Sequence, residues 1–396
     1  GKLRLISFED SGGSFGIKQA IMPMIILTCL ASKLSNKQVI WVEDRLEHLT
    51  AASSATGRLT KLRASINEKG LIEALDYDQI DDVGAYPRAP EPASLYRMHG
   101  NLSGAYKVKN IRCRNRVVLT NKTPSGLNRG FGGPQHYFAL ERLVHQIAVE
   151  LNLNVLDVIK VNLLEKKQFP YKSPSGALLD SGDFQKLVRK VVKSSTYKNI
   201  LKKKNDAIKN GKIYGIGYSA IIEPSISNMG YVTTALPYKD REKTGHKGGA
   251  LASTNVSIGP TGSVYVTCDS LPQGQGHKTI LSQIVADVFG IKINDVFVNT
   301  THDTHKDAWS IAAGNYSSRF AGAVAGSAFN AANNLKKKLK KIAASQLNCK
   351  SENILFDKEK VYDKKNSDNY LNFKRLVGIP HWSPGNLPEK LNPSLK

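Results

Sequence analysis

The sequence has few cysteines, and no two of them are spaced to act together. There are four, far apart and without a Cys-x-x-Cys pair: Cys29, Cys113, Cys268 and Cys349. This spacing argues against a disulfide framework, a structural zinc site and a cysteine-ligated iron–sulfur cluster. We expect all four thiols to be reduced and buried.

Long apolar runs are missing as well. No run reaches the roughly 20 residues that a membrane-spanning helix requires, and the longest candidate, residues 20–30, is interrupted by Pro23. The first residues do not resemble a secretory leader, since Glu9, Asp10 and two glycines follow almost at once. We therefore expect a cytoplasmic protein that does not cross a membrane.

Acidic residues are scarce relative to basic ones. The 396 residues include 56 lysines and arginines against 33 aspartates and glutamates, which gives a formal net charge of +23. Lysine runs at 202–204, 336–338 and 340–341 are compatible with binding to nucleic acid or to an acidic partner. However, residues 331–344 also show the apolar spacing of a surface helix whose lysines face water. We favour this second interpretation over nucleic-acid binding, and an acidic partner subunit remains open.

Glycine, in contrast, is gathered into three distant clusters. These are residues 12–18 (GGSFGIK), 129–135 (RGFGGPQ) and 274–277 (GQGH). Glycine adopts positive φ without strain and lets a backbone approach a ligand closely. Three such turns, each with a polar or aromatic side chain, predict a large, flat, anionic cofactor held mainly by main-chain N–H groups.

The hydrophobic pattern predicts helices and strands in both halves of the chain. In the first half we expect a buried strand at 39–42, a hairpin at 62–77, a strand at 116–120 and helices from Pro134 and at 155–164. In the second half we expect a strand at 213–222, a hairpin across 250–268, a helix at 278–289, a strand at 296–300 and a long helix at 320–347. The fold class is therefore α+β, with two α/β-type domains of mixed sheets flanked by helices. We place the first domain at 1–182, a lysine-rich helical bridge at 183–212 and the second domain at 213–396.

These segments together resemble one family, the molybdenum-binding large subunits of the xanthine oxidase and aldehyde oxidoreductase superfamily. Residues 12–18 look like its GGGFGGK loop, and residues 120–135 look like its TN-x-x-P and RGFGGPQ segment. Residues 274–277 look like its GQG-H loop, and residues 314–319 like a GTxxSR loop. Residues 41–49 resemble its W-x-E-D-R-x-E-x-L stretch, which we interpret as structural. The resemblance covers nearly all of the chain, in the family's order and spacing.

The resemblance implies molybdopterin-binding domains of the aldehyde oxidoreductase type and a role in a molybdenum hydroxylase. Such enzymes oxidise a carbon centre, for example in an aldehyde or an N-heteroaromatic ring, with oxygen from water. In prokaryotic relatives the cofactor is often the cytosine dinucleotide form of molybdopterin. The protein binds and orients this cofactor, and no side chain is expected to ligate the metal directly. Iron–sulfur clusters and FAD are expected on partner subunits only.

The same resemblance assigns roles to residues. It implies that Gly13, Phe15 and Gly16 place backbone near the metal's oxygen ligands, and that the Gln275 amide hydrogen-bonds a metal ligand between Gly274 and Gly276. Arg129 would lie near the dithiolene or the substrate. Phosphates of the dinucleotide would be held by Ser317, Ser318 and Arg319, because the planar arginine fork suits phosphate. Substrate-facing positions would be Gln19, Phe131 and Arg97.

Each assignment has a simpler alternative. The first glycine cluster also fits an ordinary tight turn, and Gln275 fits a surface hairpin. Phe131 fits a core position, and Arg97 fits a solvated surface position. Ser317 and Ser318 also fit the cap of a following helix.

Several positions depart from the family pattern. Ser14 replaces the third glycine of the first motif, and Asn128 stands where an aromatic residue is usual. Gln19 stands where some relatives carry a purine-binding glutamate, which argues against xanthine as substrate. Gly130 stands where copper-dependent carbon monoxide dehydrogenases carry their cysteine, which argues against a molybdenum–copper site.

The largest departure is the absence of a G-x-G-E segment, which in the family carries the glutamate base. The catalytic base is therefore unknown; Glu223 is the only acid that we consider as a substitute. The chain therefore looks like the middle of a large subunit. We expect a partner chain to supply this segment; otherwise the sequence is a piece of a longer subunit or a non-catalytic remnant. The alternative is a non-catalytic basic protein of the same fold that binds anions or nucleic acid, or serves as a structural subunit.

Overall fold

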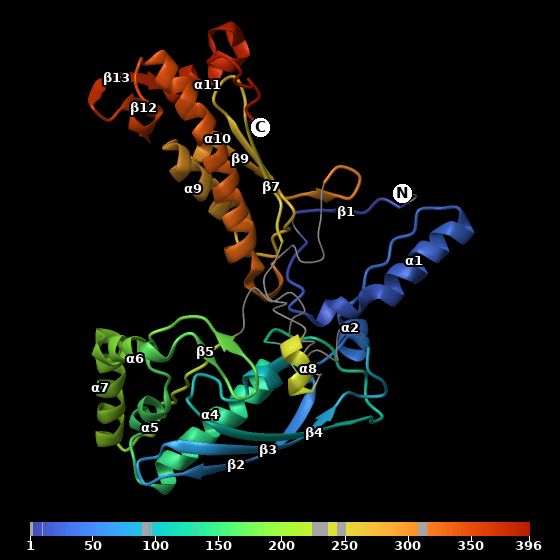
Figure 1. Cartoon of the computed structure of the whole chain (residues 1–396). Helices are drawn as coiled ribbons and strands as arrows, with labels where there is room; N and C mark the ends of the chain where they lie inside the picture. Colours follow the sequence, from blue (N-terminus) through green and yellow to red (C-terminus); the bar gives the residue numbers. More distant parts are fainter. Residues whose placement is uncertain are drawn as a thin grey trace. The chain divides into compact units, whose positions relative to one another are not determined.

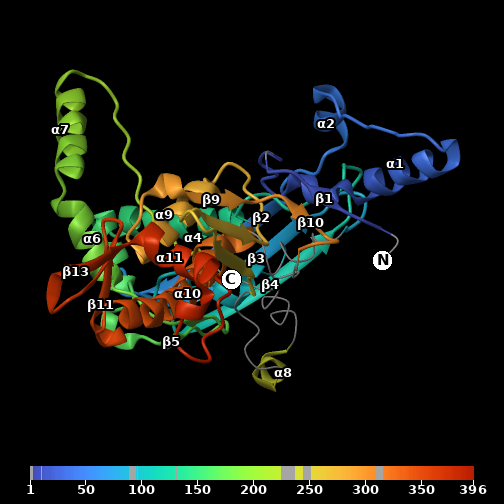
Figure 2. The same ribbon diagram turned by 90° about the horizontal axis from the view of Figure 1, so that it is seen from above.

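The computed structural model describes residues 3–9, 11–88, 95, 97–130, 132–223, 237–243, 251–307 and 315–396. Contacts divide the chain into two compact units (Figures 1 and 2). Unit 1 contains residues 1–13, 224–228 and 248–396, and unit 2 contains residues 14–223 and 229–247.

Unit 2 is built on a mixed three-stranded sheet. Strands β2 (Gly57–Ile66) and β3 (Ile72–Asp82) form the predicted antiparallel hairpin, which is longer than the pattern indicated, and β4 (Asn110–Val118) pairs parallel to β3. The hairpin turn is closed by Asn67, whose side-chain Oδ1 accepts the N–H groups of Lys69 and Leu71. Gly70 completes it at φ 75°, a conformation that glycine adopts without strain.

Helices cover one face of this sheet (Figure 1). The predicted helix beginning near Pro134 is α4 (Gly133–Glu150), followed by α5 (Val155–Asn162). The apolar stripe of α4 is buried against the sheet, with Leu140 and Val144 packed among residues such as Leu75 and Tyr77. Beyond the short strands β5 (Tyr171–Lys172) and β6 (Leu178–Leu179), the lysine-rich segment forms α6 (Phe184–Lys193) and α7 (Ser195–Lys209); α8 is Tyr238–Lys243.

The strand predicted at 213–222 is not present. This segment runs along α4, and its backbone groups pair with side chains of that helix instead of with a strand. The N–H of Ala220 donates to Glu141 at 3.0 Å, and the Tyr218 carbonyl lies 2.7 Å from the His145 ring. Helix side chains thus satisfy the extended backbone that the apolar pattern assigned to a sheet.

The strand predicted at 39–42 is also absent, and three of its four residues, Ile40, Trp41 and Val42, are exposed. A short 3₁₀ turn (Ile17–Ile21) leads into α1 (Met22–Ser35), and α2 (Arg45–Ala51) follows the segment. Val42, expected in a core, exposes 80% of its surface. Cys29 on α1 is exposed as well, so the expectation of buried thiols is wrong for this residue. The apolar residues of this segment are typical of a buried strand. However, the described parts of the chain contain no strand that pairs with it.

Unit 1 repeats the sheet pattern of unit 2. Strands β7 (Thr254–Ile258) and β8 (Val264–Cys268) form the predicted hairpin, and β9 (Val296–Asn299) pairs parallel to β8 after crossing over through α9 (His277–Phe289). The predicted long helix consists of a π turn (Phe320–Val324) that continues into α10 (Ala325–Gln346). The short strands β1 (Ile6–Ser7) and β10 (His302–Asp303) pair with each other.

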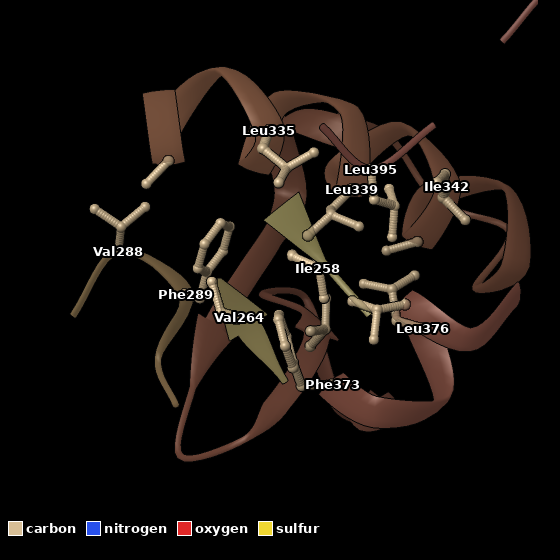
Figure 3. Close-up of a cluster of buried hydrophobic side chains, with 14 of the residues drawn as sticks. Ile258, Val264, Val288, Phe289, Leu335, Leu339, Ile342, Phe373, Leu376 and Leu395 are labelled. Atoms are coloured by element: carbon tan, nitrogen blue, oxygen red, sulfur yellow. The ribbon is translucent and has the colours of Figure 1, made fainter. Parts of the chain in front are cut away.

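The C-terminal part of unit 1 was not predicted from the sequence. It consists of the antiparallel sheet β11 (Ile354–Asp357), β12 (Lys360–Asp363) and β13 (Asn366–Asn372), followed by α11 (Phe373–Trp382). Figure 3 shows how Phe373 and Leu376 of α11 join Val264 of the sheet and Leu339 of α10 in one buried cluster. The lysines of α10 lie between these apolar positions, which confirms the predicted helix with one face in the core.

No helix in the described residues is both long enough and apolar enough to cross a membrane.

One buried carboxyl group in unit 2 makes stability depend on pH. Glu141 accepts the Tyr106 hydroxyl at 2.9 Å and the Ala220 N–H at 3.0 Å, and burial raises its pKa from 4.5 to about 7. Between these values the folded protein holds a proton that the unfolded chain has released. Stability therefore falls as pH rises through this window.

We expect Glu141→Gln to remove this dependence, because the amide keeps an oxygen acceptor for Ala220 but does not titrate. The free energy of unfolding of the unsubstituted protein, minus that of the variant, should fall by up to about 1.4 kcal/mol per pH unit within the window. Urea titrations followed by circular dichroism at several pH values measure it. Parallel pH curves for the two proteins would contradict the assignment.

Candidate functional site

In unit 2 the structure brings the first and second glycine loops together. Phe15 is exposed and has a left-handed backbone, with φ 50°. The guanidinium carbon of Arg129 lies 5.1 Å from the centre of its ring, at cation–π distance. Two predicted cofactor residues, one from each loop, thus form an exposed planar pair.

Gly16 explains why the two loops fit closely. Its φ is 97°, and a Cβ atom added to it would lie 2.7 Å from Cδ2 and 2.8 Å from the carbonyl oxygen of Leu127. The second contact involves backbone, which cannot rotate away. Only glycine therefore allows the first loop to pack on the second.

The second loop ends at the N-terminus of α4. Gly130 and Gly132 have φ values of 95° and 81°, and Gly132 is the N-cap of α4 without any side-chain cap. Pro134 lies in the first turn, as predicted. The Gly133 N–H donates to the Gly130 carbonyl oxygen at 2.8 Å and Pro134 has no N–H, so at this end the helix dipole, more than free N–H groups, favours an anion.

Arg97 supports this loop from inside the protein. Its side chain is buried and donates to the carbonyl oxygen of Gly130 at 2.8 Å and to Oε1 of Glu223 at 2.6 Å. The alternative of a solvated surface arginine is therefore wrong. Glu223, considered above as a substitute base, is the ion-pair partner that helps Arg97 to hold the loop.

The two other predicted substrate positions are less defined. The backbone of Gln19 lies in the 3₁₀ turn Ile17–Ile21, directly after the first glycine loop. Phe131 lies outside the described residues.

The third glycine loop belongs to unit 1 and is open on its glycine side. Gly274 and Gly276 have φ values of 97° and 76°, and no heavy atom lies within 4 Å of a Cβ added to either. The Gln275 side chain folds back on the loop, because its Oε1 accepts the Gln273 N–H at 2.6 Å. Gly276 is the N-cap of α9 and, like Gly132 on α4, leaves the helix without a side-chain cap.

The loop at 315–319 lies beside the third glycine loop. The Asn315 amide nitrogen is 3.3 Å from the Leu271 carbonyl oxygen, and the rings of His277 and Phe320 stack with centres 3.7 Å apart. Burial lowers the pKa of His277, so the stacked imidazole is neutral. The structure therefore brings the predicted residues of these two loops together within unit 1.

Two consecutive serines in this loop have unusual backbone conformations. Ser317 and Ser318 have φ values of 53° and 58°, in the left-handed region that costs an L-residue roughly 1–2 kcal/mol. Such strain is concentrated at functional sites, and left-handed turns can form anion-binding concavities. The N-cap of the following helical turn is Arg319, not a serine. Arg319 itself is buried, with its guanidinium carbon 4.9 Å from the centre of the Tyr316 ring.

The segment that leads to the first glycine loop is fixed on the third loop. The Ser11 hydroxyl lies 3.5 Å from the Pro272 carbonyl, and Glu9 forms an ion pair with Lys278 of α9. The hydrogen bond from Lys278 lowers the pKa of Glu9, so this carboxylate is ionised at neutral pH. Gly13 is the last residue of this segment in unit 1, and Ser14 is the first in unit 2.

Comparison with known proteins identifies the family. Residues 1–163 and residues 190–392 each match a profile described as a molybdopterin cofactor-binding domain. The chain therefore belongs to the molybdopterin cofactor-binding domains of the xanthine oxidase and carbon monoxide dehydrogenase family, which confirms the resemblance and the fold class.

Two curated relatives are large subunits. Nicotine 6-hydroxylase large subunit of Paenarthrobacter nicotinovorans is 29% identical over 351 residues, which are 88% of this chain and 41% of the relative. The carbon monoxide dehydrogenase large chain of Hydrogenophaga pseudoflava is 29% identical over 405 residues, covering 100% of this chain and 48% of the relative. The chain thus spans less than half the length of these relatives.

Solved structures of related proteins have the same fold as this chain. Quinoline 2-oxidoreductase from Pseudomonas putida 86 matches with a TM-score of 0.83 and 27% identity, over 98% of this chain and 48% of that chain. Aldehyde oxidoreductase from Desulfovibrio gigas, at a TM-score of 0.63 and 17% identity over 85% of this chain and 34% of that one, shares the fold.

Sequence reasoning missed two residues that position the site. Leu127 fixes the first loop against the second, and Asn315 links the loop at 315–319 to the third glycine loop. Asn315 lies inside a motif that the sequence did reveal. Leu127 has no signal in the sequence, because its role comes from a contact with a distant glycine.

A pair of glycine substitutions separates backbone strain from steric fit. Gly12 has φ 71° and no atom within 4 Å of an added Cβ, whereas Gly16 has φ 97° and meets Leu127. We expect Gly12→Ala to cost only about 1 kcal/mol of strain. Gly16→Ala should cost about 2–5 kcal/mol, because overpacking is added to strain. Urea unfolding of the two variants measures the difference, and equal losses would contradict the packing argument.

Proposed function

We propose that this chain is the cofactor-binding part of a molybdenum hydroxylase large subunit. The enzyme oxidises an aldehyde or an N-heteroaromatic carbon with oxygen from water. One observation carries the proposal: two glycine loops each end at a helix N-terminus without a side-chain cap, on a chain of the molybdopterin-binding family.

The residues fit a molybdopterin cofactor. The open space beside Gly274 and Gly276 leaves room for a flat ring system to approach the backbone. The N-termini of α4 and α9 and the left-handed turn at Ser317 and Ser318 suit phosphate groups. When bound, the cofactor supplies the oxidation of a carbon centre, and two electrons leave through the metal.

The chain's own residues bind and orient this cofactor. We propose that Gly13, Phe15 and Gly16 place backbone near the metal's oxygen ligands, and that Ser317, Ser318 and Arg319 hold phosphates, if the cofactor is the cytosine dinucleotide form. Gln275 exchanges its bond to the Gln273 N–H for one to the cofactor. Arg129, stacked on Phe15, adds a positive charge.

Fewer residues are proposed to contact the substrate than to bind the cofactor. Gln19 directly follows the first glycine loop and Phe131 lies within the second, and both are proposed to contact the substrate. Arg97 acts through Gly130, whose carbonyl it holds, and so positions the loop that carries Phe131. Direct contact of Arg97 with the substrate is proposed from the family resemblance alone.

An organic substrate is favoured over carbon monoxide. The relatives include proteins named for nicotine, quinoline and carbon monoxide. Gly130 stands where the copper-dependent enzymes carry cysteine, and none of the four cysteines lies within 129–135. We therefore propose a carbon centre of a neutral aldehyde or heterocycle.

The rest of the enzyme is proposed to lie outside this chain. One relative is named as a subunit of a dehydrogenase complex, and others are named large subunits or large chains. We propose that the G-x-G-E glutamate base lies outside these 396 residues, and that other subunits carry iron–sulfur clusters and flavin, in the cytoplasm.

The proposal is tested by purifying the native complex. We expect close to one molybdenum atom per chain, and release of a pterin nucleotide on acid treatment, with cytosine as the base. A complex without metal and pterin, combined with salt-sensitive affinity of the chain for DNA or RNA, would favour the alternative of a basic binding protein.

Gln275 allows a sharper test within the loaded complex. We expect Gln275→Ala to lower turnover of quinoline or an aromatic aldehyde at least about 10-fold, since loss of one preorganised donor is costly. The electron paramagnetic resonance spectrum of reduced molybdenum should also change, while pterin content is kept. Gln283→Ala is the control, because this amide is exposed on α9. Identical spectra and rates for the two variants would contradict the role of Gln275.

A further inference from the structure

Helices α6 and α7 of unit 2 carry a strongly basic surface, residues 184–212, which we call the lysine surface. The stretch contains ten lysines and arginines and one acid, Asp206. Nine of the ten basic residues are exposed. The Gln185 amide donates to the Lys160 carbonyl oxygen at 2.7 Å, which fixes α6 beside α5, and α7 follows α6 at the same end of the unit (Figures 1 and 2).

The charges of the lysine surface have almost no partners. Among the described residues, its one ion pair joins Arg189 to Asp183 at a distance of 4.0 Å. The side chains of the lysine run 202–204 form neither a hydrogen bond nor an ion pair with any described residue. On the sheet of the same unit, by contrast, Arg112 pairs with Asp76. The lack of neutralising carboxylates is therefore a local property of α6 and α7.

The other long lysine run of the chain, at 336–338 of α10, is used within its own unit. Lys336 donates to the Val288 carbonyl oxygen, and Lys338 donates to the Ser394 carbonyl oxygen. The run on α7 has no such contact with the described residues. The two runs look alike in the sequence, but the one on α7 leaves its ammonium groups available to a partner.

The arrangement of charge on α6 also costs stability. Lys186 and Lys190 lie four residues apart, as do Arg189 and Lys193, so each pair is adjacent on the helix surface. Like charges at this spacing destabilise a helix, and α6 contains no acid that would offset them. Local features that oppose stability are expected where a protein binds something.

Aliphatic side chains are exposed among these basic ones. Leu187 and Val191 of α6 expose 62% and 51% of their surface, and their spacing of four residues places them on one face of the helix. Phe184 and Val188 of the same helix pack against the core of unit 2 instead. Outside its own core, α6 thus presents a pair of apolar side chains with basic side chains around them.

This mixture favours a protein partner over nucleic acid or a bilayer. Nucleic acid offers phosphates to lysines but little apolar surface to Leu187 and Val191. Insertion into a bilayer interface needs a wide apolar face, which two exposed side chains of α6 do not provide. Protein interfaces combine an apolar centre with a polar rim, and complementary charge selects the partner.

We propose that the lysine surface binds an acidic protein, whose carboxylates pair with the lysines around Leu187 and Val191. The inference goes beyond the proposed function and does not depend on it, because none of these residues belongs to the loops proposed to bind the cofactor.

Two matched charge-reversal variants of the full chain test the surface. The first reverses four exposed lysines of α6 and α7: Lys186→Glu, Lys190→Glu, Lys202→Glu and Lys203→Glu. The control reverses four exposed lysines of unit 1 with the same spacing along the chain: Lys337→Glu, Lys341→Glu, Lys364→Glu and Lys365→Glu. Both variants change the net charge equally, so they separate a local surface from the attraction of the whole chain. Circular dichroism checks that both fold, and glutamine at the same positions replaces glutamate if they do not.

The probe is a fluorescein-labelled peptide of glutamate and leucine, and its affinity is measured by fluorescence anisotropy at about 0.15 M salt. We expect the first variant to weaken binding at least about 10-fold and the control at most about 2-fold, because modest contributions of exposed ion pairs add up. Leu187→Ser combined with Val191→Ser should weaken binding of this peptide at least about 3-fold. The same pair should leave the affinity for poly-L-glutamate unchanged.

Cross-linking identifies the natural partner. A carbodiimide forms an amide bond between a lysine amine and a carboxylate that is in direct contact with it. In the assembly purified from its source, we expect links from lysines of α6 and α7 to aspartates or glutamates of another polypeptide, which mass spectrometry locates. Lys337 and Lys341 should remain unlinked.

Three results would overturn the inference. The first is an equal loss of peptide affinity in the two charge-reversal variants, which would show attraction by net charge alone. The second is tighter binding of a DNA duplex or of phosphatidylglycerol vesicles than of the peptide, with the same loss in the first variant. The third is an assembly in which the carbodiimide joins no lysine of α6 or α7 to another polypeptide.

Discussion

Positive φ in short loops is the constraint on which the site depends. Gly16, Gly130, Gly132, Gly274 and Gly276 all have φ between 76° and 97°. At Gly16 this conformation is combined with contact to Leu127, and at Gly274 and Gly276 with open space. Glycine thus serves two purposes. In unit 2 it lets one loop pack closely on another, and in unit 1 it leaves the backbone of the loop accessible. Ser317 and Ser318 accept similar conformations without being glycine, at a cost in strain.

In both units a glycine loop is positioned by the same arrangement of a strand before it and a helix after it. Each sheet joins an antiparallel hairpin to a parallel third strand, and in each a strand is followed by a glycine loop and then by a helix. In unit 2 the loop lies between β4 and α4, and in unit 1 between β8 and α9. The helix is buried on the sheet, so its N-terminus is held rigidly, although on α4 the Gly133 N–H is already bonded to Gly130 and Pro134 has none. Packing in the core therefore determines the geometry of the surface that we propose to bind an anionic cofactor.

The sequence predicted elements whose signals are local. The hairpins of both sheets, α4, α5, α9 and the helix after Arg319 follow from periodicity and from turn residues such as Gly70. It could not predict contacts made at a distance: Arg97 beneath Gly130, Leu127 against Gly16, and the pairing of residues 213–222 with α4. The strand expected at 39–42 failed for a different reason. Its pattern describes a buried environment that the described part of this chain does not contain.

Amide hydrogen exchange compared between cofactor-loaded and cofactor-free protein tests the account most directly. If main-chain N–H groups bind the cofactor, loading should slow exchange in residues 12–18, 128–133, 274–278 and 316–319 together. The hairpin turn at residues 67–70, which is closed by its own hydrogen bonds, should be unaffected. Unchanged exchange in these four loops on loading, or slowing spread equally over the turn, would contradict the claim that the loops form the binding site.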